Sequence, residues 1–287
     1  MRIISLFENR TAVLATMHQK EKAIAPLLAS EFGMKVVVPP DFNTDRFGTF
    51  TREIERPGTQ IEAARLKARE ALNLTGETIA IASEGSFYPH PAMPLIACNR
   101  EIVLLRDRAN DLEIIGEEIS TDTNYHHHQV GTIAEAIDFA QKIGFPEHGL
   151  VVMSGQNATA KDEIVKGITS EEKLTQAIES ALQTSTTKTI HLETDMRAMY
   201  NPTRMKAIAR ATLNLIAKLH SLCPQCSTPG FDIVKRLPGL PCSWCSLPTS
   251  LIRCEIYQCQ KCQYTQETRF PNGIKTADPS HCSYCNP

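Results

Sequence analysis

Eight of the ten cysteines lie in the last quarter of the sequence, where they form four CxxC pairs. Fifteen residues separate the first pair from the second, and nineteen separate the third from the fourth. A CxxC turn directs two thiolates at one ion, and two such turns complete a tetrahedron. The spacing predicts two structural zinc ions, each with four thiolate ligands and no position left for water. The predicted ligands are Cys223, Cys226, Cys242, Cys245, Cys259, Cys262, Cys282 and Cys285.

The order in which the pairs combine is a separate question. Sequential pairing, first with second and third with fourth, needs the shortest loops and is the arrangement we expect. A crossed or nested arrangement is the alternative that the spacing leaves open. Disulfides are a competing interpretation, but the first residues, MRIISLFENRTAVLAT, do not have the pattern of an export signal. We therefore expect a cytoplasmic protein, in which thiols stay reduced and available to metal.

The charge of the cysteine-rich tail indicates what kind of partner it suits. From Cys223 onward, six basic and four acidic side chains give +2. Two zinc–thiolate centres of about −2 each bring the tail to about −2. This favours a stabilising or protein-contact module, and makes nucleic acid a less suitable partner. The tail also carries four aromatic residues, which we expect to pack around the zinc sites, with stacking on bases as the alternative: Trp244, Tyr257, Tyr264 and Tyr284.

The composition of the whole chain sets wider limits. The 287 residues are 42% hydrophobic, which is enough to bury a substantial core. The net charge of −2 argues against a protein that coats nucleic acid or membranes. No apolar run reaches the length of about 18 residues that a membrane span requires, so no membrane association is expected.

Strand and helix patterns alternate from the start of the chain to about residue 220. The expected strands are Ile3–Phe7, Ala12–Ala15, Lys35–Val38, Thr78–Ala82, Leu95–Cys98, Ile102–Leu105, Leu112–Ile115, Leu150–Met153 and Thr189–Leu192. The expected helices cover about 18–32, 59–73, 131–143, 170–183 and 203–220. The strands between 94 and 116 leave no room for helices, so part of the sheet should be antiparallel. We predict an α/β domain over 1–220, with a mixed sheet flanked by helices, followed by a tandem zinc-ribbon module over 221–287.

Polar side chains gather where two of these strands end. Thr16, His18 and Lys20 lie between a strand and a helix, where the N-terminal amides of the helix also favour an anion. Glu84 follows the apolar run Ile79–Ala82, at the strand end where α/β proteins bind ligands. The alternative is an ordinary solvated turn in each case.

A third polar cluster opens the last predicted helix. Glu193, Asp195 and Arg197 follow a strand, and Arg204 lies in the first turn of the helix. Carboxylates and guanidinium groups at one strand end can bind a metal–phosphate or a carboxylate substrate. A plain salt bridge with helix caps is the alternative. The histidines at 126–128 are adjacent, so they cannot all face one ion, and we expect them in a surface loop.

Residues 11–90 carry the motif order A-T-x-x-x-K, T-x-E, E-x-A-x-x-K-A and a strand that ends in an acidic residue and glycine. This order resembles the inosine-triphosphate pyrophosphatase and Maf-like fold. The resemblance implies phosphate contacts by Thr16 and Lys20, and metal and triphosphate binding by Glu62, Lys67 and Glu84. The paired aspartates of that family are Ser83-Glu84 here, which leaves one carboxylate to hold Mg²⁺.

The full chain more closely resembles an uncharacterised bacterial family. The shared strings are ATMHxKE at 15–21, xFGTFT at 46–51, ASEGSFxPHP at 82–91, ETDMRAxxNPTRM at 193–205 and the terminal CxxC pairs. This resemblance implies a shared fold and brings no established activity.

Two functions of different classes follow. The first is a divalent-metal-dependent hydrolase or binder of a nucleotide-like phosphorylated ligand, with Glu84, Asp195 and Lys20 as catalytic residues. In it, carboxylates hold Mg²⁺ and cations neutralise phosphate; the further binding residues are Thr16, His18, Glu62, Lys67, Glu193, Arg197 and Arg204. The alternative is a non-enzymatic adaptor whose zinc ribbons bind a protein or RNA partner. If Glu84, Asp195 and Lys20 line one pocket, the first hypothesis gains.

Overall fold

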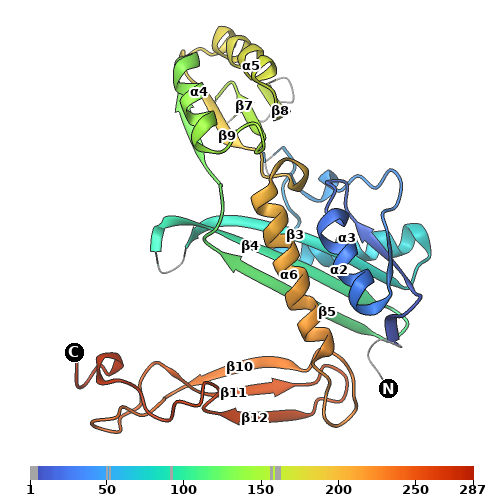
Figure 1. The fold of residues 1–287 in the computed structure, drawn as a ribbon, viewed down its shortest axis with the longest axis vertical. Helices are drawn as coiled ribbons and strands as arrows, with labels where there is room; N and C mark the ends of the chain where they lie inside the picture. Colours follow the sequence, from blue (N-terminus) through green and yellow to red (C-terminus); the bar gives the residue numbers. More distant parts are fainter. Residues whose placement is uncertain (1–5, 50, 52, 91–92, 156–157, 159–162) are drawn as a thin grey trace. The chain divides into compact units, whose positions relative to one another are not determined.

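A computed structural model describes residues 6–49, 51, 53–90, 93–155, 158 and 163–287 (Figure 1). The described chain forms two compact units. The first, here called the α/β unit, ends at Ile216, and the second, the ribbon unit, runs from Ala217 to Pro287. No helix in the described ranges is long and apolar enough to cross a membrane.

The α/β unit contains the mixed sheet that the sequence predicts. Its strand order is β2-β1-β3-β4-β5, with β1 parallel to β2 and β3, and β4 antiparallel to its neighbours. The strands are β1 (Thr11–Ala15), β2 (Lys35–Val37), β3 (Ile79–His90), β4 (Met93–Asp107) and β5 (Leu112–Ser120). The two strands expected at 95–98 and 102–105 are one long strand, β4. The strand expected at Ile3–Phe7 is wrong for its described part, because Leu6 and Phe7 are helical; residues 3–5 lie outside the described residues.

Two helices connect the first strands of this sheet. α2 (Glu21–Phe32) ends at Gly33, whose φ of 63° is the left-handed conformation that glycine adopts without strain. α3 (Gln60–Thr75) packs its alanine-rich face on β1, β3 and β4. The buried side chains between this helix and the sheet include Ala64, Ala68 and Leu72. Small residues on the helix allow a close approach to the sheet. The helix α3 therefore lies beside the part of β3 where its run of buried residues ends.

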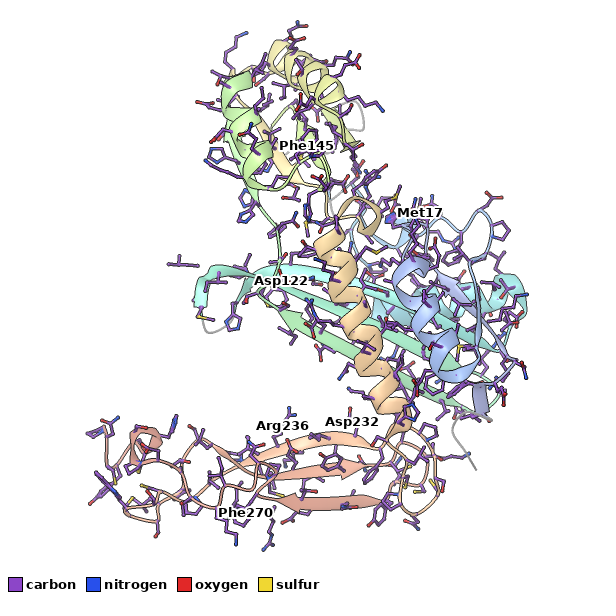
Figure 2. All side chains as sticks on the ribbon, in the orientation of Figure 1. Met17, Asp122, Phe145, Asp232, Arg236 and Phe270 are labelled. Atoms are coloured by element: carbon purple, nitrogen blue, oxygen red, sulfur yellow. The ribbon has the colours of Figure 1, made fainter. Side chains whose placement is uncertain are left out.

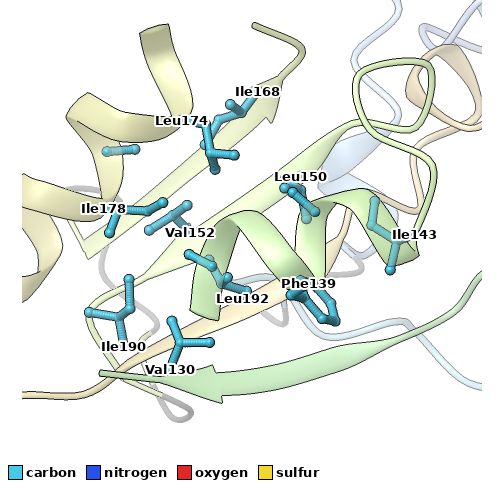
Figure 3. Packing of buried hydrophobic residues seen from close by; sticks show 13 residues of the cluster. Val130, Phe139, Ile143, Leu150, Val152, Ile168, Leu174, Ile178, Ile190 and Leu192 are labelled. Atoms are coloured by element: carbon cyan, nitrogen blue, oxygen red, sulfur yellow. The ribbon is translucent and has the colours of Figure 1, made fainter. Parts of the chain in front are cut away.

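A second sheet within the α/β unit was not anticipated. It is antiparallel, with strand order β6-β9-β7-β8. Its strands are β6 (His127–Val130), β7 (Leu150–Met153), β8 (Ile164–Ile168) and β9 (Ile190–Thr194), and its helices are α4 (Ile133–Lys142) and α5 (Glu171–Thr184). The two helices cover one face, where Leu150, Val152 and Leu192 meet Phe139 and Ile178 (Figure 3). Its central strands, β7 and β9, match the strands expected at Leu150–Met153 and Thr189–Leu192. The separate sheet was not predicted because its edge strands, β6 and β8, are short and carry polar residues.

The last helix, α6 (Pro202–His220), is set in place by a cap and by a glycine contact. The side-chain oxygen of Asn201 accepts a hydrogen bond from the Arg204 amide at 2.9 Å, which caps the first turn. Along its length the helix backbone runs against Gly116 of β5. A Cβ on that glycine would lie 2.3 Å from the Ala211 carbonyl oxygen and 2.4 Å from the Leu215 amide nitrogen.

This contact gives a stability prediction. Because both opposing atoms are backbone, Gly116→Ala can be accommodated only by moving α6, and we expect a loss of about 1–3 kcal/mol. The measurement is urea unfolding followed by circular dichroism. Gly131→Ala is the matched control, since its Cβ would meet nothing closer than 3.6 Å. Equal unfolding midpoints for the two variants would contradict the close approach.

The ribbon unit is built on a three-stranded antiparallel sheet of order β10-β11-β12. The strands are β10 (Asp232–Pro238), β11 (Ile252–Gln258) and β12 (Thr265–Arg269). Figure 2 marks Asp232 and Arg236 on β10. Two CxxC pairs lie in the connections between these strands, one pair lies before β10 and one lies after β12, as expected for a tandem zinc-ribbon module.

Candidate metal centres and ligand cavity

The eight tail cysteines form two four-thiol clusters. In each cluster the sulfur atoms lie within 4.8 Å of one another. The Cys223–Cys262, Cys226–Cys259 and Cys245–Cys282 sulfur pairs are 3.6 Å apart. A tetrahedron with zinc–sulfur bonds of about 2.3 Å has edges of about 3.8 Å. The clusters therefore have the dimensions that a four-thiolate metal site requires, and all ten cysteines of the chain are free thiols.

The expected sequential pairing is wrong, because the pairs alternate. Cys223 and Cys226 combine with Cys259 and Cys262 in the first centre, and the second centre joins the other two pairs. The reason is the antiparallel sheet. The pair before β10 and the pair after β11 lie at the same end, whereas the β10–β11 connection and the segment after β12 lie at the other end. Strand pairing thus outweighs the shorter loops that sequential pairing would give.

The tail aromatics divide between the two centres. Tyr257 and Tyr264 stack on Phe231, with ring centroids 5.7 and 5.9 Å apart, and pack around the first centre as expected. Trp244 and Tyr284, in the turns of the second centre, are 77% and 73% exposed. The expectation of packing is therefore wrong for these two residues.

Within the α/β unit, a cavity of about 310 Å³ collects polar side chains from several elements. The β1–α2 connection, marked by Met17 in Figure 2, contributes Thr16, His18 and Lys20. Glu84 comes from β3. The other predicted residues that line it are Lys67, Glu193, Asp195, Arg197 and Arg204. Nine of the ten residues predicted for this unit thus line one cavity, including the three that were assigned catalytic roles.

Glu62 is the exception, and we withdraw it from the site. Its carboxylate accepts a hydrogen bond from the Thr59 amide at 2.7 Å, while the Thr59 hydroxyl accepts one from the Glu62 amide. This reciprocal arrangement is a capping box at the start of α3. Glu62 lines a different hollow, which it shares with Arg65 and Arg69.

Other lining residues were not predicted as part of the site. The segment before α3 contributes Thr44, Asp45, Thr49, Thr51 and Arg56. Its density of hydroxyl and charged groups was the available signal. Tyr125 and Lys166 had no such signal. Lys166 lies on β8 of the second sheet, and Tyr125 lies in the segment before β6. Lys166 reaches the charged loop through an ion pair with Glu53.

Most of the charges in the cavity are paired. Glu84 forms an ion pair with Lys67 and lies 3.8 Å from Arg56. The Asp195 carboxylate accepts from Arg197 at 2.7 Å and from the Gly167 amide at 3.0 Å. These carboxylates are thus already neutralised by cations, which does not favour Mg²⁺. In the part of the chain that the structure describes, only the cysteine clusters bring three or more ligand atoms within 4.8 Å. The predicted magnesium site finds no support.

Lys20 is the unusual cation of the cavity. Its side chain is buried, and its ammonium group donates to the Ser83 carbonyl oxygen at 2.8 Å. Among the described residues it forms no ion pair with a carboxylate. Burial, together with the charge of Arg204, lowers the pKa of Lys20 to about 7. With this pKa, about half of the Lys20 side chains carry a charge near neutral pH. An anion bound in the cavity would stabilise the charged form.

His18 lies beside Lys20 and stays neutral. Burial and the neighbouring Lys20 charge lower the pKa of His18 to about 3. Its Nε2 is 3.3 Å from a carboxylate oxygen of Asp45. A neutral imidazole can act here as a hydrogen-bond donor to Asp45, so it orients the charged loop rather than adding charge to the cavity.

The comparisons with known proteins add the family. A search of the curated proteins found no match to this chain. The sequence model of one family matches residues 67–287, which include Lys67, Glu84, Asp195 and both cysteine clusters. The expected membership of an uncharacterised family is thus confirmed: the chain belongs to the family described as "Domain of unknown function (DUF6671)".

Proposed function

We propose that the cavity of the α/β unit binds a small phosphorylated, nucleotide-like molecule. The observation that carries the proposal is Lys20, a buried ammonium group on the cavity wall without a carboxylate partner among the described residues. Burying a cation in this way is costly unless an anion accompanies it. A phosphate group that enters the cavity would supply this anion and raise the pKa of Lys20.

The other charges on the wall support the same ligand class. Six basic side chains line the cavity against four acidic ones. The basic residues are Lys20, Arg56, Lys67, Lys166, Arg197 and Arg204, and the acidic residues are Asp45, Glu84, Glu193 and Asp195. Two of these cations are paired with carboxylates outside the lining, Lys166 with Glu53 and Arg204 with Glu101, so the charges nearly balance. The support for an anion therefore comes from the guanidinium groups on the wall, which bind phosphate oxygens in pairs.

An aromatic wall supports the nucleotide-like part of the proposal. Phe87 and Tyr125 both line the cavity, and their rings stack with centroids 5.4 Å apart. Aromatic side chains of this kind provide a face or an edge for a nucleobase. The volume of about 310 Å³ matches a ligand of the size of a mononucleotide.

We also propose that each four-cysteine centre holds a structural zinc ion. Four thiolates are the donor set of structural zinc, and they leave no open position for catalysis. The zinc ions would stabilise the ribbon unit and take no part in chemistry at the cavity.

The test of the cavity proposal is calorimetric titration with a panel of nucleoside mono-, di- and triphosphates and with the matching nucleosides. We expect binding of phosphorylated compounds and none of the nucleosides. Lys20→Met should weaken binding by about tenfold or more, since it removes one desolvated charge contact. Lys22→Met is the matched control, because Lys22 is exposed and its ammonium group donates to the nearby Gln19 side chain.

The pH dependence is a second readout of the same prediction. With a pKa of about 7 in the free protein, Lys20 is charged below this pH and neutral above it. Binding of an anion should therefore weaken as the pH rises from 6 to about 8, and Lys20→Met should lose this dependence. Equal affinities for the nucleoside and its phosphate, or a pH profile unchanged by Lys20→Met, would refute the proposal. Release of inorganic phosphate during the titration would extend it to hydrolysis.

A further inference from the structure

The second metal centre presents two exposed aromatic side chains. Trp244 lies in the turn between Cys242 and Cys245, and Tyr284 lies in the turn between Cys282 and Cys285. Because the four sulfur atoms of these turns lie within 4.8 Å of one another, both aromatic residues belong to the surface of one centre. They are 77% and 73% exposed, which is high for large aromatic side chains.

The first centre does not share this feature. Its two turns carry Pro224-Gln225 and Gln260-Lys261, and the aromatic rings near it stack on Phe231. Each centre has four cysteine thiolates as its ligands, so metal binding itself does not require aromatic residues in the turns. The exposed pair therefore calls for a reason other than the stability of the centre.

Two further apolar side chains in the segments of the second centre are exposed. Leu247, which follows the first turn, is 44% exposed, and Ile274 is 58% exposed. The segment after Ile274 pairs with the turn that holds Cys242 and Cys245. The Ser243 amide donates to the Ala277 carbonyl oxygen at 3.0 Å, and the Ala277 amide donates to the Pro241 carbonyl oxygen at 2.8 Å. Exposed aromatic residues with apolar neighbours are typical of protein-binding surfaces.

The charge of the second centre selects the kind of partner. The segments 239–251 and 273–287 contain one basic residue, Lys275, and one acidic residue, Asp278, whose charges cancel. A zinc ion with four thiolates adds about −2. The negative centre disfavours the phosphates of nucleic acid and favours a cationic partner. The faces of Trp and Tyr also attract cations, and the planar guanidinium group of arginine stacks on them.

We propose that the second zinc centre is a docking site for a basic segment of a partner protein, with an arginine side chain on the faces of Trp244 and Tyr284. The aromatic rings provide the contact area, and the zinc–thiolate charge provides the attraction over a longer range. The first centre, with Lys261 between two ligands and its aromatic residues engaged internally, stabilises the unit without this role.

The only tryptophan of the chain is Trp244, so its fluorescence reports directly on this surface. We expect a short arginine-rich peptide to change the emission of the full-length zinc-loaded protein in a saturable way. A glutamate-rich peptide of the same length should leave the emission unchanged. Added salt should weaken the binding, because the attraction between exposed charges is screened.

Variants are compared by the fluorescence anisotropy of the labelled arginine peptide. Trp244→Ala and Tyr284→Ala should each weaken binding by about tenfold or more, as expected for aromatic hot spots. Trp244→Phe should retain part of the affinity. Val234→Ala is the matched control in the same unit, at a residue that is 57% exposed on β10. Zinc content, measured on each sample, shows whether the unit is folded.

Three results would overturn the proposal. The first is an arginine peptide that binds Trp244→Ala as tightly as the wild type. The second is a single-stranded oligouridylate that changes the Trp244 emission at lower concentration than the arginine peptide. The third is a concentration-dependent emission of the protein alone, which would indicate that the aromatic surface binds a second copy of the chain.

Discussion

Replacing Cys223 and Cys259 together by serine is expected to leave one zinc ion per chain, whereas replacing Cys223 and Cys242 together should remove both. The first two residues belong to one centre, and the second two belong to different centres. A site with three thiolates, or with two, binds zinc much more weakly than a site with four. Sequential pairing of the CxxC turns would give the opposite result, so these two variants decide between the arrangements.

The effect on stability should be large. Structural zinc contributes about 10–16 kcal/mol of apparent binding free energy in small model domains, and the ribbon unit has few buried apolar residues outside its centres. We expect the variant without either zinc ion to lose the cooperative unfolding of the ribbon unit, measured by hydrogen exchange of β10–β12. Metal is quantified by elemental analysis of protein purified without chelators.

Cys254→Ser provides the control. Cys254 is a buried thiol of β11 that belongs to neither cluster, so its replacement tests the cost of losing a thiol without losing a ligand. We expect two zinc ions per chain in this variant. Two zinc ions in the Cys223→Ser/Cys242→Ser variant, or one in the Cys254→Ser variant, would contradict the assignment of ligands.

The metal centres show which part of a site is local in the sequence. The ligands could be predicted, because a CxxC turn is complete within four residues. The pairing could not, because it depends on hydrogen bonds between strands that lie far apart in the chain. The exposed positions of Trp244 and Tyr284 depend on the same arrangement, and composition alone gave no reason to separate them from Tyr257 and Tyr264.

The fold shows a similar division. Helices with strong apolar spacing, such as α2, α3 and α6, were predicted within a few residues of their bounds. The second sheet was missed because β6 contains His127 and His128, which are exposed on an edge strand and were expected in a loop. An edge strand with one buried residue, Val130, has no alternation to detect.

The cavity could be predicted because strand ends place their polar residues at one edge of a sheet. Lys20, which follows β1, was found in this way. Glu84 was expected just past a strand that ends at Ala82, but it lies within β3, which continues to His90. Glu62 was misassigned although its role as a cap was readable: Thr59 and Glu62 have the T-x-x-E spacing of a capping box. Lys166 was missed because its strand, β8, was missed, and a residue cannot be assigned to a site before its element is placed.

Arg204 was predicted to bind a ligand, and its contacts add a structural role. Its replacement has the largest expected effect on the stability of the α/β unit. Arg204 and Glu101 are fully buried, and the Arg204 Nε donates to the Glu101 carboxylate at 2.7 Å. The guanidinium group also donates to the Met196 carbonyl oxygen, which links α6 to the end of β9. A Cβ on Gly85 would lie 2.4 Å from Glu101 Oε1, so the glycine leaves room for this pair.

Arg204→Met should therefore destabilise the α/β unit by about 3–5 kcal/mol, because it leaves the Glu101 carboxylate buried without its partner. Replacing both members, as in Glu101→Leu/Arg204→Met, should cost less than the single change, since no isolated charge is left in the interior. Urea unfolding of the two variants and of Glu101→Leu gives the coupling free energy directly. Arg65→Met is the control at an exposed pair, where the loss of the contact with Glu113 should cost at most about 1 kcal/mol. If the double variant were as unstable as the sum of the two single variants, the buried pair would not be coupled, and the stability of α6 would have to come from its apolar face alone.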